Sequence, residues 1–371
     1  LPFKTYKRLL WLVLDDRHAR SDDDIAYVHK LLSHGRRNLQ AGEARQMYHI
    51  VLDALANGDA DDRSAGLSEA FLAEMQDAGL KPNAVSYCIM VKTYGRQRDA
   101  QKLDGVVNRI ADEFVELDAP LFNAIIQAHI ACGDLDLAAK TIRKVEEMWR
   151  QGILGQDPRR SVKIPKPNTR TYNILLNGYA EADDIVSCFR VLRQMQERGV
   201  PADEITANTI ISGLHSSWRL RRMAGLASET DFKRVFSVLP KLRDLGVPRP
   251  TSEGYTSLIS AAADAGDVET AAAVVTQMHC DGLTVGIHAY TTLMRALLAS
   301  GRIEAGLGVF DYLRQSDPAS DNRPTIVTYN ALLRGLCQSG RPDALEEAIR
   351  RFEAMQNEDG IQPTIVSYNI V

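Results

Sequence analysis

Apolar residues recur at spacings of three and four through the stretch from Lys166 to Asp203, with polar residues between them. This pattern predicts two amphipathic helices, because such spacings place side chains on one helix face. The first helix carries Tyr172, Leu175, Leu176 and Tyr179, and the second carries Ile185, Phe189, Leu192 and Met195. Two helices alone cannot bury both apolar faces, so this unit needs similar units as neighbours.

Local signals mark the ends of these two helices. Pro167 ends any helix before it, and the Thr171 hydroxyl is expected to cap the first helix. Asp183 and Asp184 stand where the second helix begins, an end that favours negative charge. Gly199 is expected to close that helix in the left-handed conformation.

Copies of this unit are recognisable from three markers in one register. The aromatic marker recurs at Tyr87, Phe122, Tyr172, Tyr255, Tyr290, Tyr329 and Tyr368, with Ala207 in the same register. Three of the gaps are 35 residues, and the others are that period plus an insertion. A proline precedes the aromatic by five residues at Pro82, Pro167, Pro250, Pro324 and Pro363. A glycine follows it by eleven at Gly133, Gly266, Gly301 and Gly340, where a turn between helices is needed.

The register divides the chain into repeating units. Seven full units are expected at 84–118, 119–168, 169–203, 204–251, 252–286, 287–325 and 326–364, and residues 365–371 begin another. Residues 49–83 are interpreted as a degenerate repeat, because the helix at 41–57 lacks the aromatic marker. Residues 1–48 are interpreted as N-terminal helices that form a cap or a degenerate repeat, with a helix at 1–20 and a second one capped by Ser21 and closed by Gly35. The predicted fold class is therefore all-α, an α-solenoid of stacked helix-turn-helix repeats.

Two units contain insertions with clustered positive charge. The insertion in 119–168 carries Arg159, Arg160 and Lys163, and the one in 204–251 carries Arg219, Arg221 and Arg222 beside Trp218. Each insertion is interpreted either as a solvated loop or lengthened helix, or as a local contact to an RNA backbone or a partner protein.

Composition and charge narrow the function class. The 371 residues have a formal net charge of −4, so the whole chain is not a basic nucleic-acid binder, which weakens a model that rests on phosphate attraction alone. The five cysteines form no C-x-x-C pair, which favours free thiols in a reducing compartment. No membrane span is expected, since the apolar run from Leu9 to Leu14 is far too short. The chain starts at Leu1 without methionine, and we expect a piece of a longer protein.

The sequence contains no pattern typical of an enzyme. The acidic triplet Asp22, Asp23 and Asp24 could suggest a metal or acid–base cluster, but a helix N-terminus explains it better, because adjacent residues point in different directions. The histidines show no metal-ligand spacing, and neither a phosphate loop nor a nucleophile motif occurs. We expect no catalytic activity, no metal and no cofactor.

Two polar columns are candidates for recognition chemistry. The residue after each aromatic marker is Cys88, Asn123, Asn173, Asn208, Thr256, Thr291, Asn330 or Asn369. Asparagine and threonine can hydrogen-bond a flat polar edge. Helix capping is the alternative, but the residue before the aromatic was expected to supply that cap, at Ser86, Thr171, Thr206, Thr328 and Ser367.

The second column is formed by the last residue of each unit. Its members are Asn83, Asp118, Asn168, Asp203, Thr251, Gly286, Thr325 and Thr364. These residues close a turn, so a structural role is the alternative. Both columns are expected at the same edge of the stack, since one ends a unit and the other opens the next.

The strings TYNILLNGYAEADDIVSCFRVLRQMQERGVPAD and IVTYNALLRGLCQSGRPDALEEAIRRFEAMQNEDGIQPT resemble pentatricopeptide repeats of the 35-residue P type. The resemblance covers about residues 49–371. It implies a right-handed α-solenoid whose first helices bind single-stranded RNA, one base per repeat. It also implies that the fifth and last residues of a unit read the base edge, and that the second residue packs against the base.

Carried over by position, the fifth and last residues are the two polar columns. The second residues are Val85, Arg170, Ile205, His288, Val327 and Val366, while Pro120 and Glu253 depart from the usual small aliphatic type. The resemblance assigns uracil to Asn173 with Asp203 and cytosine to Asn123 with Asn168. It implies pyrimidine for Asn208/Thr251 and Asn330/Thr364, and purine for Thr256/Gly286 and Thr291/Thr325, and it assigns nothing to Cys88 with Asp118.

Two functions are compatible with these features. The first is an organellar protein, of the chloroplast or mitochondrion, that binds single-stranded RNA and acts in transcript stabilisation, processing, splicing or translation. The second is a scaffold subunit of a large organellar complex that contacts mainly proteins through the insertions and the N-terminal helices.

Overall fold

The computed structural model describes residues 2–14, 22–57, 62–113, 115–151, 165–226, 229–316 and 322–371. Within these segments every regular element is a helix. The helices of the N-terminal half are α1 (Phe3–Leu14), α2 (Asp22–Asn38), α3 (Ala41–Asn57), α4 (Asp62–Asp77), α5 (Ala84–Gln97), α6 (Ala100–Asp112), α7 (Ala119–Ala131), α8 (Leu135–Arg150) and α9 (Thr169–Glu181). Those of the C-terminal half are α10 (Ile185–Glu197), α11 (Glu204–Met223), α12 (Glu229–Asp244), α13 (Ser252–Ala265), α14 (Val268–Cys280), α15 (Ile287–Ala299), α16 (Ile303–Arg314), α17 (Ile326–Gln338), α18 (Pro342–Asn357) and α19 (Ile365–Tyr368).

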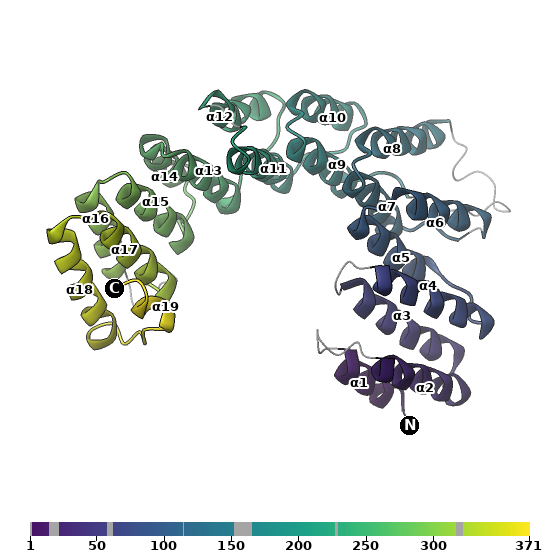
Figure 1. Cartoon of the computed structure of the whole chain (residues 1–371). Coiled ribbons are helices and arrows are strands. Elements are labelled where there is room, and N and C mark those ends of the chain that lie inside the picture. The colour runs from purple at the N-terminus through teal and green to yellow at the C-terminus, as the bar shows by residue number, and fades with distance from the viewer. Residues whose placement is uncertain are drawn as a thin grey trace. The chain divides into compact units, whose positions relative to one another are not determined.

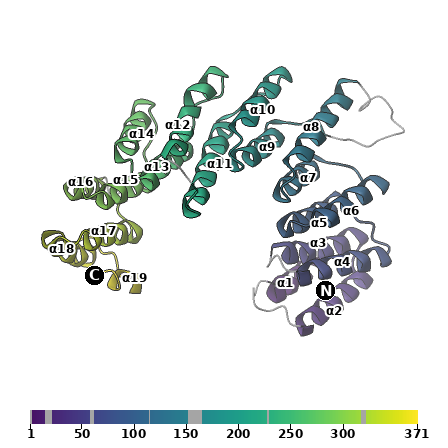
Figure 2. The same cartoon turned by 45° about the horizontal axis from the view of Figure 1, so that its top comes forward.

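The chain forms two compact units, Leu1–Leu175 and Leu176–Val371. In the first, each odd-numbered helix packs against its own second helix and against the next odd-numbered helix, from α1 through α3 and α5 to α7 (Figure 1). In the second, α11, α13, α15 and α17 form the same kind of row, with α14, α16 and α18 along one side of it (Figure 2). The predicted all-α stack of helix pairs is confirmed.

In several helix pairs a buried tyrosine on the first helix donates a hydrogen bond to a carboxylate at the end of the second helix. Tyr87 Oη donates to Glu113 Oε2 at 2.6 Å, and Tyr255 Oη donates to Asp281 Oδ2 at 2.5 Å. Burial, followed by the hydrogen bond to the carboxylate, raises the pKa of Tyr87 and of Tyr255 to about 12. The aromatic marker is therefore a neutral donor that satisfies its hydroxyl inside the pair.

The same tyrosine–carboxylate hydrogen bond occurs in the pair α3 and α4, so the aromatic marker extends further toward the N-terminus than the sequence indicated. Tyr48 is 1% exposed and donates to Glu74 Oε1 at 3.0 Å, over the same separation of 26 residues as in the Tyr87 pair. The prediction that the helix at 41–57 lacks an aromatic marker was wrong, because α3 starts earlier relative to its tyrosine than the later first helices do. The boundary drawn between residues 48 and 49 falls inside α3.

The N-terminal helices also differ from their predicted limits. The described part of the predicted helix at 1–20 forms α1 (Phe3–Leu14), while residues 1 and 15–20 and Ser21 lie outside the described residues. The acidic triplet occupies the first turn of α2, as predicted. Gly35 does not close α2: the helix continues to Asn38, and Gly35 is buried where an added Cβ would lie 2.5 Å from Met47 Sδ.

The caps of the first helices are not the predicted ones. Asn83, Asp203 and Thr325 are the N-caps, with extended backbone, and their side chains accept from the backbone N–H three residues on. The hydroxyls predicted to cap, at Ser86, Thr206 and Thr328, stand at that third position and bond back to the backbone N–H of the cap. At these three junctions the last residue of one unit thus forms a capping box with the first turn of the next unit.

The described turns after the first helices from α5 onward use a left-handed residue. Gly133, Gly266, Gly301 and Gly340 all have positive φ, as the glycine marker predicted. Arg98 and Asp183 stand at the same place in their units with φ of 57° and 59°. The turn geometry is therefore kept even where the sequence lacks glycine.

Candidate nucleic-acid interface

The second residue of each unit lies on the first turn of a first helix, and several of these residues leave large apolar side chains in solvent. Val85, Ile205, Val327 and Val366 are 48–64% exposed. The second-position Arg170 and His288 are also exposed. Exposed apolar side chains that repeat at one position favour a contact surface rather than chance.

The fifth-position side chains lie one turn further, and three of them bond to the unit that follows. Thr171 Oγ1 donates to Asn123 Oδ1 at 2.8 Å, and the hydroxyls of Thr291 and Thr328 are 3.3 Å apart. His49 Nε2 lies 2.9 Å from Ser86 Oγ, the equivalent contact for α3. His49 thus stands at a fifth position that sequence reasoning missed, and the signal for it was the preceding Tyr48.

One pair brings the two predicted columns into direct contact. Asn208 Nδ2 donates to Thr251 Oγ1 at 2.6 Å, and the Thr251 backbone N–H donates to Asn208 Oδ1 at 3.0 Å. These are the fifth and last residues of the unit at 204–251. Thr251 consequently makes no side-chain cap bond to α13.

The remaining fifth positions differ in their surroundings. Thr256 Oγ1 donates to the Ser252 carbonyl of its own helix at 2.7 Å, whereas Asn369 is exposed. Asn173 is 8% exposed, and the half-buried Asn330 has an Oδ1 without a partner among the described residues. At Cys88 burial raises the thiol pKa, with Lys92 acting in the opposite direction.

Most last-position side chains are helix caps. Asp118 Oδ1 accepts from the Leu121 backbone N–H at 2.8 Å, and Asn168 Oδ1 accepts from that of Thr171 at 3.1 Å. Thr364 forms a capping box with Ser367, while Gly286 caps α15 without a side chain. Asp118, Asn168, Gly286, Thr325 and Thr364 are exposed, so capping leaves these edges open to solvent.

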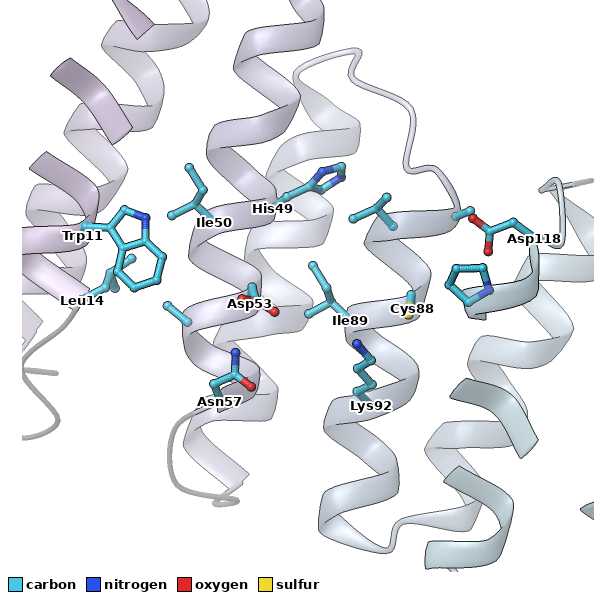
Figure 3. Close-up of a pocket in the computed structure, with 14 residues that line it drawn as sticks. Trp11, Leu14, His49, Ile50, Asp53, Asn57, Cys88, Ile89, Lys92 and Asp118 are labelled. Atoms are coloured by element: carbon cyan, nitrogen blue, oxygen red, sulfur yellow. The ribbon is translucent and has the colours of Figure 1, made fainter. Parts of the chain in front are cut away.

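A cavity of about 620 Å³ lies along α1, α3 and α5 in the first unit (Figure 3). It is lined by the fifth-position residues His49 and Cys88, the second-position Val85, and Asp118, the last residue of the repeat at 84–118. Trp11, which is 50% exposed, forms the opposite wall. Burial and the nearby Arg45 lower the pKa of His49 to about 4, so its imidazole is neutral at neutral pH.

The basic residues of the second insertion are largely engaged within the protein. The insertion lengthens α11 to Met223, Arg221 Nη1 lies 3.0 Å from Asp183 Oδ2, and Arg222 stacks over the Trp218 ring. Trp218 is 3% exposed and belongs to the core rather than to a surface. Arg219 is exposed, and Arg159, Arg160 and Lys163 lie outside the described residues.

The described part of the chain contains no group of three or more His, Cys, Asp or Glu arranged to hold a metal ion. His215 and His279 instead lie within hydrogen-bonding reach of Asp264 and Tyr290. None of the described helices has both the length and the apolar character needed to cross a membrane.

Comparison with protein families identifies the repeat. The PPR repeat family matches residues 167–216 and 324–371, and the pentatricopeptide repeat domain matches residues 237–297 and 273–338. The chain is a pentatricopeptide repeat protein. The matched residues include both strings on which the resemblance rests, at 171–203 and 326–364.

Relatives of this pentatricopeptide repeat protein occur in Arabidopsis thaliana. A mitochondrial pentatricopeptide repeat-containing protein is 25% identical over 46% of this chain and 19% of its own length. A chloroplastic one is 26% identical over 54% of this chain and 23% of its own length. The small ribosomal subunit protein mL103 (rPPR7) is 24% identical over 53% of this chain and 43% of its own length. The chain thus spans less than half the length of these relatives.

Solved structures agree with the fold. The pentatricopeptide repeat protein PPR10 from maize superposes with a TM-score of 0.57 at 16% identity, over 95% of this chain and 44% of that one. The same protein in complex with an 18-nt psaJ RNA element gives a TM-score of 0.50 at 17% identity, over 95% and 47%. At this level of identity the likeness concerns the helical-repeat fold.

Proposed function

We propose that this protein binds single-stranded RNA along its first helices and acts in post-transcriptional RNA metabolism in a mitochondrion or chloroplast. The observation that carries the proposal is the contact between Asn208 and Thr251, the predicted fifth and last residues of one unit. Exposed apolar second residues such as Ile205 and Val327 stand beside these columns and can pack against a base. The RNA complex of the structurally similar maize protein and the organellar names of the relatives support this function.

The proposed reading is one base per unit. The fifth-position amide or hydroxyl and the last-position side chain contact the base edge, and the second residue packs against the base. By this scheme Asn123 with Asn168 selects cytosine. His49 with Asn83 adds one further pair at the N-terminal end.

The test is the double variant Asn208→Ala/Thr251→Ala in gel-shift titrations with oligonucleotides that differ at one base. Loss of one base contact should weaken binding by about 1–3 kcal/mol and relax selectivity at that base alone. The matched control is Thr276→Ala/Asn357→Ala, which removes the same residue types from α14 and from the end of α18. An Asn208/Thr251 variant that binds as tightly and as selectively as the control contradicts the proposal.

A second candidate function is that of a scaffold subunit in an organellar ribonucleoprotein. It is favoured by the relative named as a ribosomal subunit protein and by three exposed apolar residues at the end of α11, Leu220, Met223 and Leu226. Deleting the segment around Trp218 is unsuitable as a test, because this side chain is buried. Leu220→Asp/Met223→Asp should instead release the protein from large particles in a density gradient and leave RNA binding unchanged; co-sedimentation equal to wild type rejects the scaffold function.

A further inference from the structure

Helices α15 and α17 are neighbouring first helices (Figure 2). Residues of both line a cavity of about 670 Å³. Its polar lining consists of Arg295, Arg334, Arg341, Asn330, Gln338 and Ser339. No carboxylate of the described residues lines it, although the chain has 48 acidic residues against 44 lysines and arginines. The cavity is therefore locally positive in an acidic protein.

Two of these arginines have no charged partner in the described part of the chain. Arg295 and Arg334 occupy the ninth position of successive units, both are exposed, and neither forms an ion pair there. Arg341 differs, since its Nη2 lies 2.6 Å from Asp343 Oδ2. Other arginines of these units are paired as well, such as Arg302 with Glu269 at 2.7 Å and Arg351 with Asp311 at 2.6 Å.

Two guanidinium groups that line one cavity without a carboxylate among its lining residues favour an anion there, because opposite charges attract. A phosphate oxygen pair suits the planar fork of an arginine better than a halide does, because two parallel N–H donors match two oxygens. The same cavity contains the fifth-position Asn330, whose buried Oδ1 has no partner among the described residues, and the exposed second residue Val327. The lining of this cavity thus combines an exposed apolar side chain, an amide oxygen without a hydrogen-bond partner among the described residues, and two guanidinium groups.

We propose that Arg295 and Arg334 together hold one phosphate group of an RNA strand in this cavity, beside the base contacted by Asn330. The inference rests on the proposed RNA-binding function and adds the residues that hold the backbone. A ninth-position row of this kind also explains how a chain of net charge −4 binds a polyanion, because the positive charge is placed where the strand lies.

The test measures the affinity of wild type and of Arg295→Gln/Arg334→Gln for a labelled oligouridine over a series of KCl concentrations. For single strands each neutralised phosphate contributes about 0.7 to the slope of log Kobs against log salt concentration. If the two arginines share one phosphate, the double substitution should make this negative slope shallower by about 0.7. The affinity at low salt should fall about tenfold. Arg295→Lys/Arg334→Lys should keep the slope but bind more weakly, because lysine retains the charge without the bidentate fork.

Arg193→Gln/Arg350→Gln is the control for net charge, since it removes two exposed arginines from the second helices α10 and α18. If Arg295→Gln/Arg334→Gln and this control show the same slope of log Kobs against log salt concentration, the phosphate site is rejected and the proposed RNA binding is unaffected. If wild type binds no RNA at all, both the proposed function and this inference are overturned.

A free phosphate would satisfy the same chemistry, so a second arm uses inorganic phosphate as the probe. With RNA as the occupant, phosphate at the ionic strength of the chloride buffer should neither raise the Tm nor displace the oligonucleotide better than chloride does. A rise in Tm that appears in wild type and disappears in the glutamine variant assigns the cavity to a free anion and overturns the RNA assignment.

Discussion

A fifth-position side chain can bond within the protein and still contact a ligand. An asparagine amide offers two donors and two acceptor lone pairs, and the contact of Asn123 with Thr171 occupies one lone pair. A base edge can therefore be bonded while Thr171 keeps its partner. Asn208 differs, because both ends of its amide contact Thr251, so a base must share or replace these bonds.

His49 makes stability sensitive to acid. Its pKa is about 4 in the folded protein against an ordinary value of 6.5, owing first to burial and then to Arg45. Between these values the unfolded chain binds more protons, so stability should be lost as pH falls from 6.5 toward 4. His129 and His215, whose pKa values burial also lowers, act in the same direction.

The measurement is the urea midpoint of wild type and of His49→Gln between pH 7 and pH 4. The variant should lose part of the pH dependence, with the remainder due to the other two histidines. If the urea midpoint changes equally with pH in the two proteins, His49 does not contribute to the acid sensitivity of stability.

The left-handed turn residues give a second prediction at this scale. Gly266 has φ of 78° and nothing within 4 Å of an added Cβ, so Gly266→Ala should cost about 1 kcal/mol through the backbone alone. Arg98 has φ of 57° at the equivalent place, and Arg98→Gly should stabilise by about 0.5–1 kcal/mol, since relief of strain exceeds the entropy gained by the unfolded chain. Urea denaturation checks both signs, and a destabilised Arg98→Gly would show that this turn is not strained.

At the scale of the helix, close approach between first helices depends on small residues. An added Cβ at Gly95 of α5 would lie 2.8 Å from Ala128 Cβ and 2.9 Å from its Cα on α7. Backbone cannot move aside as a flexible side chain can, so the two helices would have to separate. The apolar pattern of α5 gives no indication of this contact.

Gly95→Ala should therefore destabilise the protein by about 1–3 kcal/mol, as overpacking generally does. The matched control is Gly105→Ala on the exposed face of α6, where nothing lies within 4 Å of the added Cβ. The control should gain about 0.5–1 kcal/mol because helix propensity improves. Equal effects of the two substitutions in chemical denaturation would contradict the close-approach argument.

For the whole molecule, the main packing among the described helices is between neighbours within each of two compact units. Stability in such a stack is roughly a sum of unit and interface terms, and distant units are not coupled directly. Unfolding should therefore occur in more than one step, unlike that of a small globular domain.

Differential scanning calorimetry measures this directly. The calorimetric enthalpy should exceed the van't Hoff enthalpy, because several cooperative blocks melt separately. Equal enthalpies, with a single transition by circular dichroism and tyrosine fluorescence, would show that the stack melts as one block.

The sequence by itself determined the repeat, since period, aromatic marker, proline and turn glycine are local signals repeated in register. It also predicts which positions are second, fifth and last in each unit. It misassigned the caps, because a hydroxyl such as Thr171 looks the same at the N-cap and at the third position, and only backbone geometry separates them. It missed Tyr48 and His49 because α3 begins more residues before its tyrosine than the later first helices do.

Only the tertiary structure decided which side chains meet. The pairing of Asn208 with Thr251 joins residues 43 positions apart, and the burial of Trp218 beside Arg222 depends on how α11 packs. The carboxylate-free cavity between α15 and α17 likewise arises from residues on separate units. Contacts of this kind depend on how helices stack, because interhelical distance and rotation are set by the packing of the whole unit rather than by any single helix.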